Sequence, residues 1–177
     1  MFYIEPTQEQ HGFAKDLVLR CNYGRRGRAD GDSRMQEVGM LGQTCILDLG
    51  GLPRPEISDG FDGGFDLTLN NKRVDVKTMG RTVDMKEHYV HNFIGYQMKY
   101  DCEYYIFLSY NYTNNKLFFC GVVSKDEFLE KSKFYAKGTK RFRDDGTYFY
   151  SKAPLYEIGQ NDLKQVYSLQ DVLNNIK

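Results

Sequence analysis

Three residues near the middle of the chain have the types and spacing of a hydrolytic metal site. Asp66 lies nine positions before Asp75, Lys77 follows two positions later, and Asn70 and Asn71 stand between the two aspartates. Carboxylates with few other ligands and a nearby ammonium group suit Mg²⁺ or Mn²⁺, which keep their water molecules and bind phosphate oxygens, better than they suit Zn²⁺. The reaction that matches this set of groups is hydrolysis of a phosphodiester.

A β-hairpin would place the two aspartates opposite each other. Residues 65–69 and 73–77 alternate apolar and polar side chains, and an Asn-Asn pair tolerates the positive φ angles of a two-residue turn. The register that follows pairs Leu69 with Lys72, Leu67 with Val74, Asp66 with Asp75 and Phe65 with Val76. Because strand side chains alternate, Asp66, Asp75 and Lys77 then share one face and the apolar residues share the other. The facing carboxylates cost up to about 1 kcal/mol unless a cation or a proton lies between them.

Two helices are predicted before the hairpin. Thr7 and Gln10 form a capping-box pattern, and apolar residues then recur at helical spacing, which predicts a helix over residues 7–21. Ser33, followed three residues later by a glutamine, indicates the start of a second helix, and this helix carries Glu37.

The remaining elements are predicted from the same periodicities. From residue 44 a short apolar run indicates an extended segment, and the Gly- and Asp-rich stretch that follows Pro55 is typical of a loop at the entrance of a site. The later elements that we expect are a helix over 84–100, strands over 103–110 and 116–123, a short helix over 126–133 and one or two helical turns within 162–176. Residues 134–153 are basic and aromatic without a clear period.

The composition indicates one globular domain. At 177 residues we expect a single domain over residues 1–177, with a core at about residues 33–125, an N-terminal helix and a C-terminal extension. The net charge is zero, so any attraction for nucleic acid must come from local clusters of charge. Four separated cysteines without a C-x-x-C pair indicate free thiols. No signal peptide or apolar run of membrane length is seen, so we expect a soluble cytoplasmic protein without a membrane partner.

The segment over residues 33–110 resembles the PD-(D/E)xK nuclease superfamily. Asp66 followed by the D-V-K tripeptide from Asp75 to Lys77 is similar to the family signature, and Glu37 stands where the family has a helix glutamate. The proline of the signature is missing, because Gly-Phe precedes the first aspartate. The resemblance implies a restriction-endonuclease-like α/β core, with a central mixed β-sheet flanked by helices.

The resemblance also implies a role for each matching residue. Asp66 and Asp75 would hold Mg²⁺, or Mn²⁺ in its place, and Lys77 would orient the attacking water. Glu37 would be an outer metal ligand or a partner of that water, and Asp62 remains an alternative to Asp66 as the first ligand. The implied activity is that of a Mg²⁺-dependent deoxyribonuclease acting on DNA, with endonucleolytic cutting expected.

Basic segments supply candidate contacts with DNA. Lysine and arginine can contact phosphates, and the aromatic residues interleaved with them can stack on bases. The candidate residues are Arg25, Arg26 and Arg28 in one segment and Lys137, Lys140, Arg141 and Arg143 in the other. Gln97 and Tyr100, on the helix expected over 84–100, are similar to the Q-x-x-x-Y element of the exonuclease and recombination branches of the family, with a spacing one residue shorter.

Two other functions stay open at this stage. A Holliday-junction or branched-DNA resolvase of the same fold would act as a symmetric homodimer, and a catalytically inactive nucleic-acid-binding module would keep the fold without turnover. The chain has no Walker A loop, no G-x-G-x-x-G after a strand, no G-x-S-x-G elbow and no H-E-x-x-H helix. These absences from the sequence disfavour nucleotide kinases, dehydrogenases, serine hydrolases and zinc peptidases.

Overall fold

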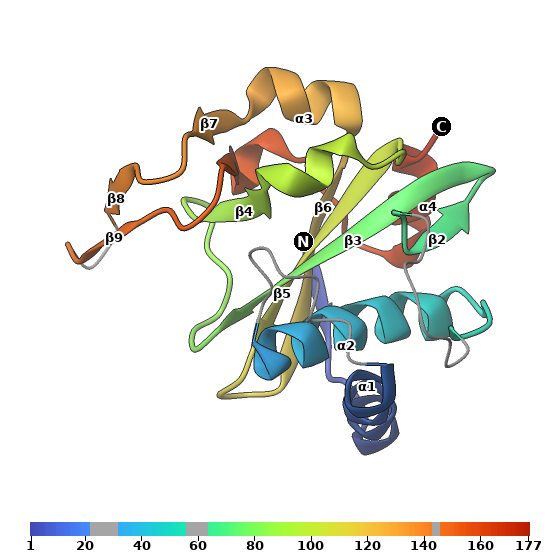
Figure 1. The fold of residues 1–177 in the computed structure, drawn as a ribbon. Coiled ribbons are helices and arrows are strands. Elements are labelled where there is room, and N and C mark those ends of the chain that lie inside the picture. Colours follow the sequence, from blue (N-terminus) through green and yellow to red (C-terminus); the bar gives the residue numbers. More distant parts are fainter. Residues whose placement is uncertain (22–31, 56–63, 143–145) are drawn as a thin grey trace.

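A five-stranded mixed sheet lies at the centre of the protein. The structure is a computed structural model that describes residues 1–21, 32–55, 64–142 and 146–177 (Figure 1). The strand order is β1-β6-β5-β3-β2, and the strands are β1 (Phe2–Ile4), β2 (Leu67–Leu69), β3 (Lys72–Arg81), β5 (Tyr104–Asn111) and β6 (Lys116–Ser124). β3 and β5 run parallel and the other neighbours run antiparallel, so the predicted mixed α/β class is confirmed.

Helices and two smaller sheets surround this sheet in the described part of the chain. The α-helices are α1 (Gln8–Cys21), α2 (Ser33–Leu49), α3 (Lys125–Lys131) and α4 (Leu169–Asn175), and the 3₁₀ helices are η1 (Gly95–Lys99) and η2 (Gln160–Asp162). One small antiparallel sheet has the order β4-β10-β7, from β4 (Val90–Ile94), β7 (Lys133–Tyr135) and β10 (Leu155–Gly159). The other is a ribbon of β8 (Lys140–Phe142) and β9 (Tyr148–Tyr150). None of the described helices is long and apolar enough to cross a membrane.

Hydrophobic side chains pack on both faces of the central sheet. Because strand side chains alternate, Ile106 of β5 belongs to a first core with α2 and α4, whereas Tyr105 and Phe107 belong to a second core. The second core includes Phe93 of β4 and Phe128 of α3. Figure 1 shows α1 and α2 on one side of the sheet and β4 with α3 on the other. Both faces of β5 and β6 are therefore covered, which explains their nearly continuous apolar sequences.

Several predicted elements are confirmed. The strands predicted over 103–110 and 116–123 are β5 and β6, and the short helix predicted after them is α3. The capping box of the first helix is present, because the amide of Gln10 donates to Thr7 Oγ1 at 3.2 Å and the amide of Thr7 donates to Gln10 Oε1 at 2.9 Å. All four cysteines are free, as expected.

The second helix is longer than predicted. The extended segment expected from residue 44 is wrong, because α2 continues to Leu49. Its residues from Leu41 to Leu47 are all buried, since this part of α2 packs against both the central sheet and α1. A short apolar run has the same appearance in a buried strand and in a buried helix, so its periodicity could not separate them. The N-cap is Asp32, whose Oδ1 accepts the amide hydrogen of Met35 at 2.8 Å, and not Ser33.

The helix predicted over residues 84–100 is wrong. This segment contains β4 and the 3₁₀ helix η1, and β4 pairs antiparallel with β10 from near the end of the chain. The partner strand lies about 60 residues away, so local sequence could not reveal it. The second face of the central sheet is consequently covered by the β4-β10-β7 sheet together with α3, and not by a long helix.

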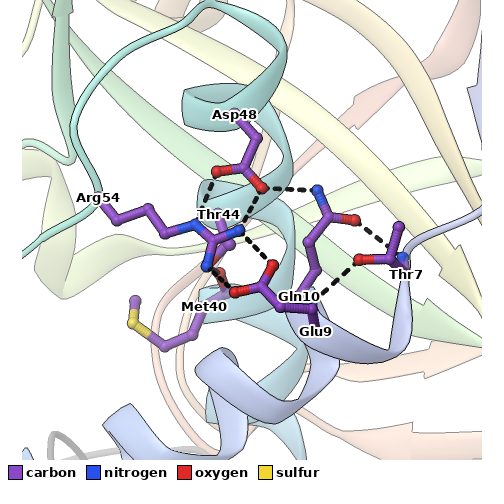
Figure 2. A network of polar contacts seen from close by, with 7 residues as sticks. All are labelled: Thr7, Glu9, Gln10, Met40, Thr44, Asp48 and Arg54. Atoms are coloured by element: carbon purple, nitrogen blue, oxygen red, sulfur yellow. Dashed lines mark hydrogen bonds and ion pairs between the residues drawn. The ribbon is translucent and has the colours of Figure 1, made fainter.

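A network of polar contacts holds α1 against the end of α2 (Figure 2). Arg54 Nε donates to Asp48 Oδ1 at 2.7 Å, and Arg54 Nη2 donates to Glu9 Oε2 at 2.6 Å. Gln10 Nε2 donates to Asp48 Oδ2 at 2.7 Å, which extends the network to the capping box of α1. The hydrogen bonds from Arg54 hold the pKa of both carboxyl groups below their usual values. The network thereby fixes the chain as it leaves α2.

We expect Gly42 to be needed for the close approach of α2 to the sheet. A Cβ atom at Gly42 would lie 2.0 Å from Thr78 Oγ1 and 2.9 Å from Leu108 Cδ1, whereas at Gly39 nothing lies within 4 Å. Gly42→Ala should lower the free energy of unfolding by about 1–3 kcal/mol, because overpacking outweighs the better helix propensity of alanine. The matched control Gly39→Ala should raise it by about 0.5–1 kcal/mol. Urea unfolding measures both, and equal stabilisation by the two variants would contradict this packing.

Candidate active site

The β2–β3 hairpin has the turn and the register that the sequence predicts. Asn70 and Asn71 adopt φ angles of 50° and 62°, as a two-residue turn of type I′ requires. The predicted register is confirmed where the ladder runs, since Leu67 pairs with Val74. Asn70 Nδ2 also donates to the carbonyl oxygen of Leu173 at 2.9 Å, which ties the turn to α4. The start of β3 is therefore held in place relative to β2.

The ladder ends before it reaches the two aspartates. The amide of Asp66 donates to the carbonyl of Val74 at 2.9 Å, so the expected strand pairs of Asp66 with Asp75 and of Phe65 with Val76 are not part of the ladder. Phe65 packs against the second core and not with Leu67 and Leu69 in the first, where the alternation of a regular strand would have placed it. Asp66 Oδ2 instead accepts the amide hydrogen of Val76 at 2.6 Å. This hydrogen bond replaces a strand partner at the point where β2 stops.

Asp66, Asp75 and Lys77 nevertheless meet, and we call them the carboxylate–lysine cluster. Lys77 Nζ lies 2.9 Å from Asp75 Oδ1 and 2.7 Å from Asp75 Oδ2. Asp66 shares a hydrogen bond with Asp75 and interacts electrostatically with both partners. The side chains of Asp75 and Lys77 are only 9% and 21% exposed, and the ring of Phe93 lies 5.4 Å from the ammonium group. The cluster therefore lies between the β2–β3 hairpin and the second core.

The cluster contains one more carboxylate than cations. Burial raises the pKa of Asp66 well above its usual value, and the negative charge of Asp75 raises it further, against the weaker opposing effects of Lys77 and the Val76 amide. Burial by itself lowers the pKa of Lys77, but the charges of Asp75 and Asp66 together outweigh it, so the pKa is raised and the ammonium group is retained. Either a proton or a cation at the two carboxylates would balance the remaining negative charge.

The donor set fits Mg²⁺ bound through few protein ligands. Mg²⁺ commonly uses one or two carboxylates and completes its coordination with water and substrate phosphates. In the ranges that the structure describes, no group of three or more His, Cys, Asp or Glu side chains is arranged to hold a metal. A divalent ion at the two carboxylates would relieve the repulsion that raises the pKa of Asp66. Asp62, the alternative first ligand, lies outside the described residues.

The structure does not bring Glu37 to the cluster. Its charge acts on the hydroxyl of Tyr110, raising the pKa of that tyrosine together with burial, which is the larger effect. Tyr110 of β5 pairs with Gly80 of β3, which lies five residues beyond Asp75. At about 3.3 Å per residue, Gly80 and Asp75 are about 16 Å apart along the strand. α2 instead contacts the cluster through Gln43, whose Nε2 donates to the carbonyl oxygen of Asp66 at 3.0 Å. Sequence reasoning missed Gln43 because it ended the helix at this position.

The candidates for nucleic-acid contact are dispersed over the fold. Gln97 lies on η1, and Tyr100 just after η1 packs against Gly64, where an added Cβ would lie 2.8 Å from that of the tyrosine. Lys137 and Lys140 are exposed. Arg141 is half-buried and forms an ion pair with Glu157. The other four candidates lie outside the described residues: Arg25, Arg26, Arg28 and Arg143.

Comparison of the chain with models of protein families, with curated proteins and with solved structures found no match. The structure itself shows a mixed α/β protein with a five-stranded mixed sheet and small antiparallel sheets.

We expect Asp66→Asn to stabilise the metal-free protein at neutral pH. The folded-state pKa of Asp66 is raised above the unfolded value of about 3.9, so the folded state binds more protons and stability falls as the pH rises from about 4 through the folded pKa. Asparagine keeps an acceptor for the amide of Val76 but carries no charge. The variant should therefore melt at a higher temperature than the wild type at neutral pH, with a flatter pH dependence above about pH 4.

Asp75→Asn is the matched control for this substitution. It leaves the ammonium group of Lys77 enclosed without its carboxylate, and should lower the free energy of unfolding by up to about 3 kcal/mol. Calorimetry in EDTA across the acidic and neutral range measures both variants. A melting temperature of Asp66→Asn below that of the wild type at neutral pH would show that the charge on Asp66 stabilises the fold.

Proposed function

We propose that this chain is a Mg²⁺-dependent nuclease that hydrolyses phosphodiester bonds in DNA, with Mn²⁺ able to substitute. The observation that carries the proposal is a pair of carboxylates, the half-buried Asp66 and the buried Asp75, that share the single cation of Lys77. A carboxyl group with a strongly raised pKa, as at Asp66, is more frequent at functional sites, where carboxylates gathered to bind a cation repel each other in its absence. The resemblance of these residues to the PD-(D/E)xK signature supports the same activity, and a restriction-endonuclease-like core is part of this proposal.

Each residue of the cluster has a role in the proposed reaction. Asp66 and Asp75 would hold Mg²⁺, and the bound ion would supply charge stabilisation at the phosphoryl oxygens and a more acidic water. Lys77 would orient the attacking water, because its ammonium group is fixed both by Asp75 and by the adjacent ring of Phe93. Gln43 would position Asp66 through its hydrogen bond to the backbone.

Metal binding by Asp75 would require one rearrangement at Lys77. Both oxygens of Asp75 lie within 3 Å of Lys77 Nζ, so Lys77 must release one of them before Asp75 can hold a metal. The side chain of Lys77 is 21% exposed, so the cluster is not sealed from solvent. The ammonium group would then be free to contact water or a phosphate oxygen.

A second candidate function is a nucleic-acid-binding module without turnover. The observation that favours it is that every member of the cluster already has a structural partner. Asp75 and Lys77 neutralise each other, and Asp66 accepts the amide hydrogen of Val76. Metal-dependent cleavage separates the two candidates.

We expect Lys77→Arg to lower the rate of cleavage by at least on the order of 100-fold while the protein stays folded. Arginine keeps the positive charge and the ion pair with Asp75, but its planar guanidinium cannot occupy the position of the ammonium group, and misplacement by about 1 Å costs on the order of 100-fold in rate. Lys72→Arg, on the same strand and paired with Glu103, is the matched control and should cut like the wild type. The assay follows circular single-stranded, supercoiled duplex and linear DNA with Mg²⁺, Mn²⁺ or EDTA.

The outcomes of this assay separate the candidates. Metal-dependent cutting that is lost in Lys77→Arg, with an unchanged circular dichroism spectrum, supports the nuclease. Undiminished cutting by that variant would refute the role of Lys77. If the wild type cuts neither circular nor linear DNA with any metal, the binding module replaces the nuclease.

A further inference from the structure

The β8–β9 ribbon exposes an aromatic face. In its register Phe142 pairs with Tyr148 and Lys140 pairs with Tyr150, so these four side chains project from the same face. Phe142 is 64% exposed, Tyr148 is 53% exposed and Tyr150 is 58% exposed. Large aromatic side chains that gather on an exposed surface indicate a binding site. Figure 1 shows this ribbon extending from the edge of the fold, beyond β7.

The rings and the lysine on this face are close neighbours. The ring centroids of Phe142 and Tyr148 are 6.2 Å apart, and those of Tyr148 and Tyr150 are 5.9 Å apart. Lys140 Nζ lies 4.0 Å from the ring centroid of Tyr148 and 5.0 Å from that of Phe142. The face therefore combines several aromatic rings with a positive charge at their centre.

The opposite face anchors the ribbon to the rest of the fold. Arg141 forms an ion pair with the buried Glu157 of β10, and its guanidinium lies 3.8 Å from the ring centroid of Tyr135. The amide of Ser151 donates to the carbonyl oxygen of Thr139 at 3.0 Å, which closes the base of the ribbon. Arg141, which the sequence suggested as a nucleic-acid contact, is thus engaged in anchoring. The exposed face is held in place from behind.

The charge around the ribbon favours an anionic partner. Residues 131–142 and 146–152 contain five lysines and Arg141 and no Asp or Glu, although the whole chain has no net charge. Between these ranges stand Arg143, Asp144 and Asp145, so the segment as a whole is also positive. Two copies of this chain that met through this face would bring like charges together. A polyanion is the complementary partner.

We propose that this face binds single-stranded nucleic acid, with bases stacked on Phe142, Tyr148 and Tyr150 and phosphates near Lys137 and Lys140. Unpaired bases present flat faces that stack on aromatic side chains in a sequence-tolerant way, and lysines along the path neutralise the backbone. In a duplex those faces are hidden in the helical stack. The inference goes beyond the proposed cleavage, because it requires neither a metal nor the carboxylate–lysine cluster.

Fluorescence anisotropy of a labelled oligothymidylate of about 20 nucleotides, in EDTA, tests this proposal on the full chain. Tyr148→Leu removes the ring but keeps apolar bulk, and should weaken binding at least about fivefold. Tyr148→Phe keeps the ring and should bind like the wild type. Tyr167→Leu is the matched control, since Tyr167 is 70% exposed and lies outside the ribbon, and it should leave binding unchanged. An unlabelled duplex should compete far less well than the unlabelled single strand.

Two results would overturn the proposal. One is that Tyr148→Leu binds as tightly as the wild type, or that duplex competes as well as single strand. Either outcome would mean that the protein contacts phosphates but does not stack on bases. The other is a wild type that does not bind the oligonucleotide but forms a dimer that Tyr148→Leu disrupts, which would make this face an interface between copies. Because the measurement is made in EDTA, its failure and the failure of cleavage are independent.

Discussion

The parallel pairing of β3 with β5 is the constraint on which the rest of the structure depends. It runs through eight consecutive residue pairs and places Asp75 beside Tyr105 and Lys77 beside Phe107. One face of this pair is covered by α2, and the other is covered by the β4-β10-β7 sheet and α3. Asp75 and Lys77 of β3, which lie on the second face, are therefore largely buried. Burial, together with the charge of Asp75, then raises the pKa of Asp66.

This enclosure connects the fold to the proposed chemistry. Two carboxylates and one ammonium group that are largely removed from solvent leave one negative charge unbalanced, and either a proton or a cation can balance it. Such an arrangement costs stability, and natural proteins keep costly arrangements chiefly where function needs them. The β8–β9 ribbon differs in kind, because Phe142, Tyr148 and Tyr150 are open to solvent. The carboxylate–lysine cluster, which is largely buried, is thus separate from the exposed basic and aromatic face of the β8–β9 ribbon.

Sequence reasoning succeeded where local patterns decide the structure. The Asn70 and Asn71 turn, the register of Leu67 with Val74 and the apolar strands β5 and β6 all follow from short segments. It failed where contacts between distant segments determine the secondary structure. The partner of β4 is β10, and the helical state of the run from residue 44 depends on packing against the sheet and α1. The clustering of Asp66 with Asp75 was predicted, but the packing of Phe65 against the second core was not.

A carboxyl-detected NMR titration of Asp66, assigned by its absence from Asp66→Asn, would decide whether this cluster has the unbalanced charge of a cation site. Without divalent ions Asp66 should titrate well above the usual value of about 3.9, and Mg²⁺ should shift the midpoint downward because the ion replaces the proton. A midpoint at the usual value that does not respond to Mg²⁺ would contradict this prediction. In that case the carboxylates would neither repel each other nor share a cation, and the proposed nuclease site would lose its physical basis.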